Sequence, residues 1–369
     1  MPSRRLKQKI TGPRLTLLGK TYPSKIIGLH NRFRAKTDKR LIYQDIRKHP
    51  GKIHQGVFGI YVPTQDKHII YLRRGAKDIT VAHELMHGIL YEEGYVATRC
   101  RMADLKTEPR IGILAHKIQD VVIHPVLFQQ LRRSGFDVDQ EEKYRSVSLI
   151  EALQKRAAEP SDPYAPAYIL SLFSDAISYV ESYFRYPFAR EQLQRIYRER
   201  FPATLQLGEE IVQLISWIPD RTPLKYRVLM TRLIYHLDQV AEAHHVPLSL
   251  PTRILLPPFL VKSRLADPTR EFFSLKRAET WESKDSGQYL LALQFLPDKS
   301  YSQVWSFQHV DQQKQAAEQL QKQLDGMEIG DFLKFNYLEY LLIEKKSRRR
   351  CLVKRITFGS AGRPSMAST

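Results

Sequence analysis

The pattern of apolar and polar positions changes along the 369-residue chain and predicts three kinds of structure in turn. Short apolar runs at residues 56–62 and 68–73 predict two strands, and the residues between them have the composition of a hairpin turn. Helical spacing dominates residues 146–246, where apolar residues recur three and four positions apart between proline-containing breaks. Beyond residue 247 short strand-like runs return, so the last part is predicted to mix strands and helices.

Two helices are predicted directly after the two strands. The first runs from residue 79 to about residue 93, with Asp78 as its N-cap and Gly94 as its C-terminal stop. The second runs from residue 111 to residue 133, and a kink or a restart is expected at Pro125, which lacks a backbone donor. A strand pair followed by two helices therefore makes up the first folded unit.

Further along the chain, the same patterns predict individual elements. The helices expected in the middle region are residues 167–184, 208–217 and 224–243. The strands expected after it have the sequences RILL, YLLALQF and QVWSF. A polar helix is expected around residues 311–324, and a closing hairpin is expected to pair residues 332–343 with residues 351–358.

The chain is therefore predicted to be an α+β protein built from five parts. These parts are a basic N-terminal arm (1–50), a strand-and-helix unit (51–145), a helical region (146–246), a small α+β domain (247–358) and a disordered tail (359–369).

The net charge of +19 is concentrated at the N-terminus, where residues 1–50 contain fourteen Lys or Arg and only two acids. Such clustering is typical of surfaces that bind nucleic acid, acidic protein or anionic membrane. Solvated charge that keeps the protein soluble is an equally good interpretation. The arm is therefore a candidate contact for nucleic acid.

Composition argues against several classes of protein. A hydrophobic content of 43% and an aromatic content of 10% are sufficient for a buried core. Cys100 and Cys351 are far apart and fit neither a disulfide framework nor a thiolate zinc site. No apolar stretch approaches the length of a membrane-spanning helix, and the charged N-terminus does not resemble a signal peptide. We therefore expect a cytoplasmic protein without a membrane span.

The most informative short motif is HELMH at residues 83–87, inside the first predicted helix. Residues four apart lie on one face of a helix, so His83 and His87 can both point at one metal ion. Glu84 is rotated by about 100° from His83, and there its carboxylate can take a proton from a zinc-bound water without binding the metal. The motif therefore predicts a Zn²⁺ site in which Glu84 is the general base.

A catalytic zinc needs a third protein ligand, and the second predicted helix offers candidates for it. His116, Asp120 and His124 recur every four residues and form one polar stripe on an otherwise apolar helix. Burying such a stripe is costly unless it has a partner, which is either the metal or a polar seam between helices. We favour Asp120 as the ligand, because the metal would neutralise its carboxylate. His116 or His124 can instead be the third ligand or support the ligands.

The HELMH segment resembles the HExxH motif of the zincin metallopeptidases. A third ligand on a following helix resembles the gluzincin arrangement, although this chain has HxxxD or DxxxH where gluzincins have ExxxD. The glycine and third histidine that extend the motif in metzincins are replaced by Leu90 and Glu93.

This resemblance covers residues 56–135, and it implies that the unit at residues 51–145 is a zincin-like metallopeptidase core. Such a core has a small sheet and two active-site helices, and an edge strand holds an extended peptide or protein substrate by backbone pairing. The implied activity is hydrolysis of peptide bonds by a zinc-activated water. The alternative is a nucleic-acid-associated binding protein whose zinc site is structural or degenerate.

Overall fold

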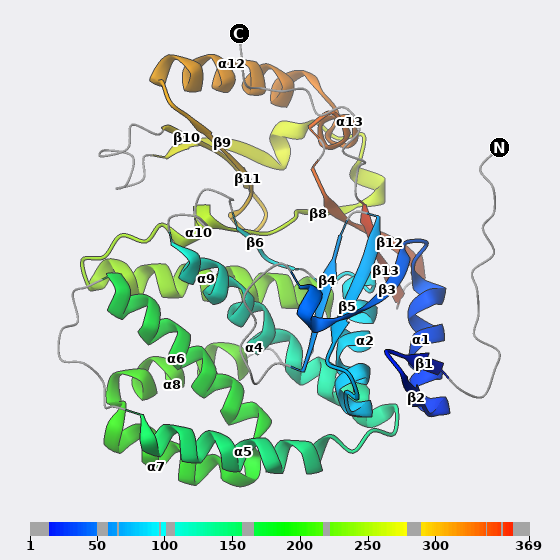
Figure 1. Cartoon of the computed structure of the whole chain (residues 1–369). Coiled ribbons are helices and arrows are strands. Elements are labelled where there is room, and N and C mark those ends of the chain that lie inside the picture. Colours follow the sequence, from blue (N-terminus) through cyan, green and yellow to red (C-terminus); the bar gives the residue numbers. More distant parts are fainter. Residues whose placement is uncertain are drawn as a thin grey trace. The chain divides into compact units, whose positions relative to one another are not determined.

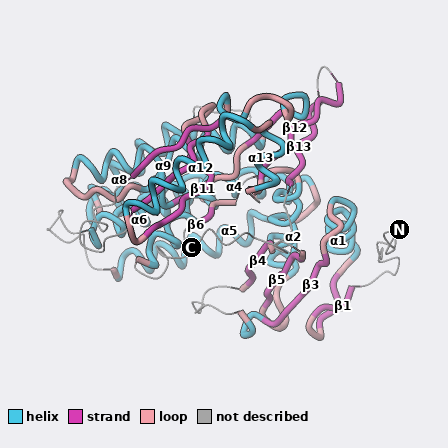
Figure 2. The backbone as a smooth tube through the Cα atoms, turned by 90° about the horizontal axis from the view of Figure 1, so that it is seen from above, coloured by secondary structure: helices cyan, strands magenta, loops and turns pink. Residues whose placement is uncertain are grey.

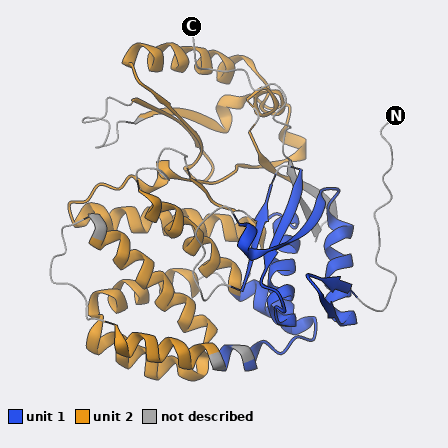
Figure 3. Ribbon diagram, viewed as in Figure 1, with its two compact units in different colours: residues 1–94, 125–144 blue, residues 95–124, 145–369 orange. Residues whose placement is uncertain are grey.

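The chain contains both helices and strands, which agrees with the predicted α+β class (Figure 1). The structure, a computed structural model, describes residues 15–49, 58–64, 66–95, 97–100, 108–156, 166–216, 222–278, 289–336, 338–347 and 350–356. The first fourteen residues of the expected arm and the expected tail at 359–369 lie outside these ranges. The chain divides into two compact units (Figure 3). Unit 1 comprises residues 1–94 and 125–144, and unit 2 comprises residues 95–124 and 145–369.

Unit 1 contains a three-stranded sheet in the order β3-β5-β4. β3 (Arg40–Asp45) runs parallel to β5 (Lys67–Leu72), and β4 (Gly59–Pro63) runs antiparallel to β5. The predicted pairing of the two strands is therefore confirmed, although residues 56 and 57 of the first lie outside the described residues. Alternate side chains of β5 point to opposite faces, as strand geometry requires. Ile69 and Tyr71 form a small apolar cluster on one face, and His68 contacts Phe33 on the other.

Two helices cover the His68 face of this sheet. α1 (Ser24–Lys36) packs against α2 (Asp78–Glu92), and α2 also packs against β4 and β5. A glycine allows the two helices to approach closely, because a Cβ atom at Gly88 would lie 2.3 Å from the ring of Phe33. β1 (Leu15–Leu17) and β2 (Lys20–Tyr22) form a short hairpin before α1. Residues 15–48 belong to the basic stretch that was predicted to be an N-terminal arm. In the structure they are therefore part of the folded unit 1.

The two ends of α2 compare with the sequence prediction in different ways. Asp78 was expected to be the N-cap, but it is the first helical residue, and the extended Lys77 occupies the cap position. The carboxylate of Asp78 instead lies 3.4 Å from the Nζ of Lys20, at a helix end where a negative charge is favourable. At the other end Gly94 has a φ of 92°, a left-handed conformation that favours glycine, so the predicted stop is confirmed.

The second predicted helix is α4 (Pro109–Arg133), which begins two residues earlier than residue 111. It continues through Pro125, so the helix does not restart there. Proline removes one backbone hydrogen bond, whereas the apolar residues on both sides of it, including Val122 and Leu127, are fully buried and hold the helix together. Within the described residues α4 is long and apolar enough to span a membrane, a test that a mostly buried core helix such as this one also passes.

The rest of the chain begins with five helices, α5 (Val138–Lys155), α6 (Pro166–Arg185), α7 (Arg190–Arg200), α8 (Pro202–Ser216) and α9 (Pro223–Ala243). The predictions at residues 167–184 and 224–243 are confirmed. α8 begins six residues before the predicted start at Gly208. This glycine is an interior packing position, because a Cβ atom there would lie 2.3 Å from the ring of Tyr179 on α6.

The C-terminal part is built from two small sheets (Figure 2). One has the order β11-β10-β9 and consists of β9 (Phe273–Ala278), β10 (Tyr289–Phe295) and β11 (Ser300–Phe307). The other has the order β13-β12-β8 and consists of β8 (Phe259–Val261), β12 (Tyr340–Ser347) and β13 (Arg350–Ile356). The predicted polar helix is α12 (Val310–Gly326), which packs against the first sheet. The predicted RILL segment is split between α10 (Leu250–Arg253) and the two-residue β7 (Ile254–Leu255), which pairs with β6 (Arg99–Cys100).

The predicted closing hairpin is correct only in its second half. β12 pairs with β13, but β12 begins at Tyr340 instead of residue 332. Residues 332–335 belong to α13 (Ile329–Phe335). Ile329, Phe332 and Leu333 are spaced for one helical face and are all fully buried, so packing favours helix at this apolar run.

Candidate metal centre

The HELMH segment lies in the middle of α2, and its two histidines project from one face of that helix. His83 and His87 are about one turn apart, and their Nε2 atoms are separated by 3.0 Å. Their rings meet edge to face, with centroids 4.7 Å apart. Both side chains are half-buried. The two histidines therefore share a face, as the helical spacing predicts.

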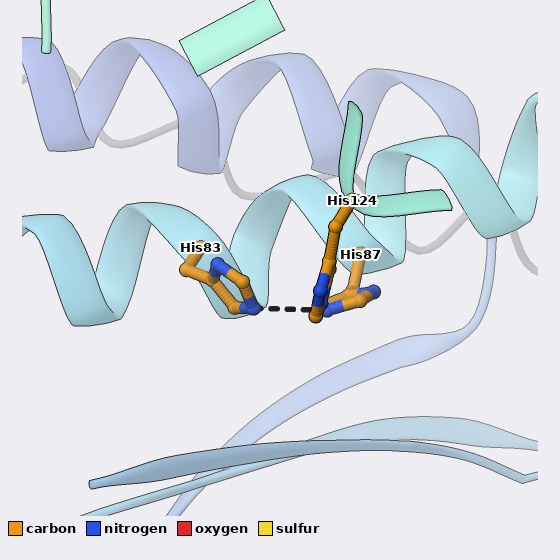
Figure 4. A group of neighbouring side chains, drawn as sticks. All are labelled: His83, His87 and His124. Atoms are coloured by element: carbon orange, nitrogen blue, oxygen red, sulfur yellow. Dashed lines mark hydrogen bonds between the residues drawn. The ribbon is translucent and has the colours of Figure 1, made fainter. Parts of the chain in front are cut away.

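A third histidine, His124 of α4, points its ring toward this pair (Figure 4). Potential ligand atoms of the three side chains all lie within 4.8 Å of one another. One turn further along α4, the ring of Phe128 lies 5.7 Å from the ring of His83, and Phe128 belongs to unit 1. Because α4 is continuous, this contact also places His124 near the pair.

The polar stripe of α4 leads from the surface into the protein. The side chain of His116 is 67% exposed, that of Asp120 is 19% exposed and that of His124 is 10% exposed. One carboxylate oxygen of Asp120 lies 3.3 Å from the Nε2 of His116, and the other, Oδ1, lies 3.9 Å from the Nε2 of His124. Oδ1 is buried and has no hydrogen-bond partner among the described residues. Of the three stripe residues, only His124 belongs to the described three-histidine group.

The Nδ1 atom of His124 contacts a carboxylate. It lies 2.9 Å from the Oε1 of Glu181 on α6, and the same oxygen accepts a hydrogen bond of 2.8 Å from Arg185. Burial alone would lower the pKa of His124, but the carboxylates of Asp120 and Glu181 outweigh it and raise that pKa above its ordinary value. Burial likewise opposes ionisation of Glu181, yet His124 and Arg185 together hold its pKa below its usual range.

Glu84 is buried and lies on the side of α2 that faces β4. A Cβ atom at Gly59 of β4 would be 2.8 Å from the Cγ and 2.9 Å from the Oε1 of Glu84. The carboxylate therefore lies directly against the strand, in space that only a glycine leaves open. This placement agrees with the rotation of about 100° that separates Glu84 from His83 on the helix.

Sequence reasoning missed Glu181 and Arg185. Their four-residue spacing predicts an ion pair on one helix face, and the structure contains that pair. No local pattern connects Glu181 with His124, which precedes it by 57 residues. Only the packing of α6 beside α4 brings the carboxylate to the histidine.

The three imidazoles have the chemistry of a metal site. Without a metal, one imidazole of the pair His83 and His87 donates a hydrogen bond to the other, whereas a cation could accept a lone pair from each of the three rings. Histidine nitrogens suit Zn²⁺, Cu²⁺, Fe²⁺ and Ni²⁺. Ligand nitrogens at about 2.0–2.1 Å from a tetrahedral zinc would lie roughly 3.3 Å apart, close to the 3.0 Å between His83 and His87. The group therefore fits a metal ion of this class.

No protein-family model, curated protein or solved structure matches the chain. A fold of this kind does not by itself define an activity. The chemistry of the three histidines and of Glu84 beside them therefore carries the functional interpretation.

Proposed function

We propose that this protein is a zinc-dependent metallopeptidase of the HExxH type, with His83, His87 and His124 as the metal ligands. The observation that carries the proposal is the convergence of three imidazoles, two from the motif and one from the following helix. Three protein ligands are typical of catalytic zinc sites, which keep one position for water or substrate. Bound there, Zn²⁺ lowers the pKa of its water to about 7 and polarises the substrate carbonyl.

We favour His124 over Asp120 as the third ligand. A ring nitrogen of His124 lies within 4.8 Å of ligand atoms of both His83 and His87, and its burial would shield a metal bond from competing water. Asp120 is not a member of the three-histidine group, and its Oδ1 lies 3.9 Å from the Nε2 of His124.

Glu84 is the general base in this proposal. It follows the first ligand directly in the sequence, and burial keeps its carboxylate away from bulk water. Its role is to accept a proton from the attacking water and to deliver it to the amine that leaves when the peptide bond breaks.

β4 is the strand on which we propose that the substrate lies. Among the described strands β4 pairs only with β5, so its other edge can take an extended peptide through backbone hydrogen bonds. Gly59 of β4 lies against the Glu84 carboxylate, so a peptide paired there would pass close to the general base. The arrangement is consistent with the resemblance to zincins.

The proposal is tested by metal analysis of the purified protein together with a cleavage assay. We expect about one zinc per chain and cleavage of peptides from a digest of denatured protein, followed by mass spectrometry. Glu84→Gln should retain the zinc and lower the cleavage rate by about 10²–10⁴-fold, the usual contribution of a general base. Glu93→Gln, at the C-cap of the same helix, is the matched control, because Glu93 pairs with Arg32 and Lys36 and not with the motif.

Two results would contradict the peptidase. Absence of stoichiometric zinc from the wild-type protein would overturn the metal centre. Retained zinc with equal cleavage by wild type and Glu84→Gln would overturn the role of Glu84. A protein that binds zinc and cleaves none of the peptides would instead favour the nucleic-acid-associated alternative, which salt-sensitive binding to DNA or RNA would support.

A further inference from the structure

We infer that Glu181 of α6 is a positioning residue for His124, so the metal centre extends into the helical region of the chain. The inference rests on the proposed metal centre and adds a requirement that the motif does not contain. The motif and the stripe lie within residues 83–124, whereas Glu181 lies on a helix that begins at Pro166.

The contact with Glu181 determines which nitrogen of His124 faces the metal position. A neutral imidazole carries its proton on one ring nitrogen and a lone pair on the other. An ionised carboxylate only accepts hydrogen bonds, so Glu181 at 2.9 Å favours the proton on Nδ1. The lone pair is then on Nε2, the nitrogen that lies 3.9 Å from the Oδ1 of Asp120. This is the tautomer that a histidine bound to zinc through Nε2 requires.

Glu181 is itself held in place. Arg185, one turn further along α6, donates a hydrogen bond of 2.8 Å to the same carboxylate oxygen, and its side chain is only 11% exposed. α6 is also anchored to α4 by Lys117, whose Nζ donates to the backbone oxygen of Ser174 and to the Oγ of Ser178. Two polar contacts therefore fix α6 along the helix that carries His124. His124 is carried by α4 and contacted by Glu181 of α6, so its ring keeps its orientation before a metal binds.

Charge gives a second reason for a carboxylate at this position. Three neutral imidazoles leave the two positive charges of the metal uncompensated in a partly buried site, which is unfavourable. A carboxylate on the far side of one ligand offsets part of this charge and makes the ligand nitrogen more basic. Removal of such an outer partner typically weakens metal binding by about 10–100-fold.

The test compares three variants by their affinity for Zn²⁺ alone, measured by competition with a chelator. Glu181→Leu removes the acceptor and should weaken zinc binding by about 10–100-fold. Glu181→Gln keeps an oxygen that can accept from Nδ1 and should fall between this variant and the wild type. Asp175→Asn is the matched control, because Asp175 lies on the same helix and pairs with Arg156, not with His124.

A second readout separates positioning from a general loss of stability. Each variant is loaded with Co²⁺, whose visible absorption depends on the geometry of its ligands. We expect a changed spectrum for Glu181→Leu, partial recovery for Glu181→Gln and the wild-type spectrum for Asp175→Asn. Denaturant unfolding of the metal-free proteins shows whether Glu181→Leu and Asp175→Asn differ in stability.

The inference is overturned if Glu181→Leu binds zinc as tightly as the wild type while His124→Ala has lost it. It is also overturned if Asp175→Asn weakens binding as much as Glu181→Leu, or if the wild type binds no zinc. Its failure is distinguishable from failure of the proposed function. If the wild type binds zinc and cleaves no peptide, only the proposed peptidase activity is contradicted. If the wild type cleaves peptides and the Glu181 variants bind zinc as tightly as it does, only the inference about Glu181 is contradicted.

Discussion

The buried His68 and the three-histidine group differ in what their ring nitrogens face. His68 is fully buried, with Nδ1 at 2.8 Å from the hydroxyl of Tyr61 and Nε2 at 3.0 Å from the carboxylate of Glu92. The Oγ1 of Thr37 lies 3.2 Å from the same Nε2. In the three-histidine group formed by His83, His87 and His124, ring nitrogens instead face one another.

The difference separates a structural histidine from a candidate ligand more reliably than burial does. The hydroxyls of Tyr61 and Thr37 complete the hydrogen bonding of His68, with the Glu92 carboxylate beside its Nε2, and leave no place for a cation. Imidazoles that face one another can each offer a lone pair to a single positive ion. His124 combines both environments, because its Nδ1 contacts Glu181 and its ring also belongs to the three-histidine group.

The largest effect is expected when one member of the three-histidine group is removed. His87→Ala should lower zinc affinity by more than about 100-fold, beyond the loss typical of an outer partner, and should abolish peptide cleavage with it. His68→Gln should leave the zinc content unchanged, because His68 has no place in the group. Zinc analysis after dialysis against a weak chelator measures both. Equal zinc loss from the two variants would contradict the distinction between His68 and the three-histidine group.

The next largest effect is expected at the contact between β4 and the general base. In Gly59→Ala the new methyl group overlaps the Cγ and Oε1 of Glu84, and the flexible carboxylate should move more readily than the backbone. A displacement of about 1 Å can cost up to about 100-fold in rate, so kcat should fall by up to this factor while zinc affinity is unchanged. Steady-state kinetics and zinc titration on the same sample measure both quantities.

Gly28→Ala is the matched control for this substitution. Gly28 lies on α1, and a Cβ atom there meets nothing within 4 Å. Alanine is favoured over glycine in a helix by up to about 1 kcal/mol, so this variant should be slightly more stable and equally active. A rate that falls equally in both variants would show that Gly59 has no special relation to Glu84.

The accuracy of the sequence predictions depends on how far apart the interacting residues lie along the sequence. The pair His83 and His87 is a four-residue pattern within one helix, so the sequence alone predicts it. The same spacing found the stripe on α4 and limited the third ligand to three residues. The choice among them depends on which turn of α4 reaches His83 and on the distant Glu181, and no local pattern contains this information. The same limit explains α13, where burial of Phe332 decided between helix and strand.

A smaller effect, on stability, is expected from the structural histidine. His68→Leu removes the hydrogen-bond partner of Tyr61 and of Thr37 inside the protein and should lower the free energy of unfolding by about 2 kcal/mol, roughly a 30-fold change in the equilibrium constant. His68→Gln can keep one of these hydrogen bonds and should recover part of the loss. Urea unfolding of the metal-free proteins measures the effect. Unchanged stability of His68→Leu would show that the network contributes nothing.

The last effect, expected only at acidic pH, is a pH dependence that comes from His30, a buried histidine with a hydroxyl partner and no carboxylate in its described contacts. Its Nδ1 lies 2.7 Å from the hydroxyl of Tyr43. Burial, assisted by the positive charge of Arg34, lowers the pKa of His30 from 6.5 to about 4. Between these two values the unfolded chain binds a proton at this residue and the folded chain does not, so stability should fall as the pH falls from 6.5 toward 4. Urea unfolding at several pH values should show a smaller decline for His30→Gln than for the wild type, because glutamine does not titrate. An equal decline in the two proteins would show that His30 does not cause it.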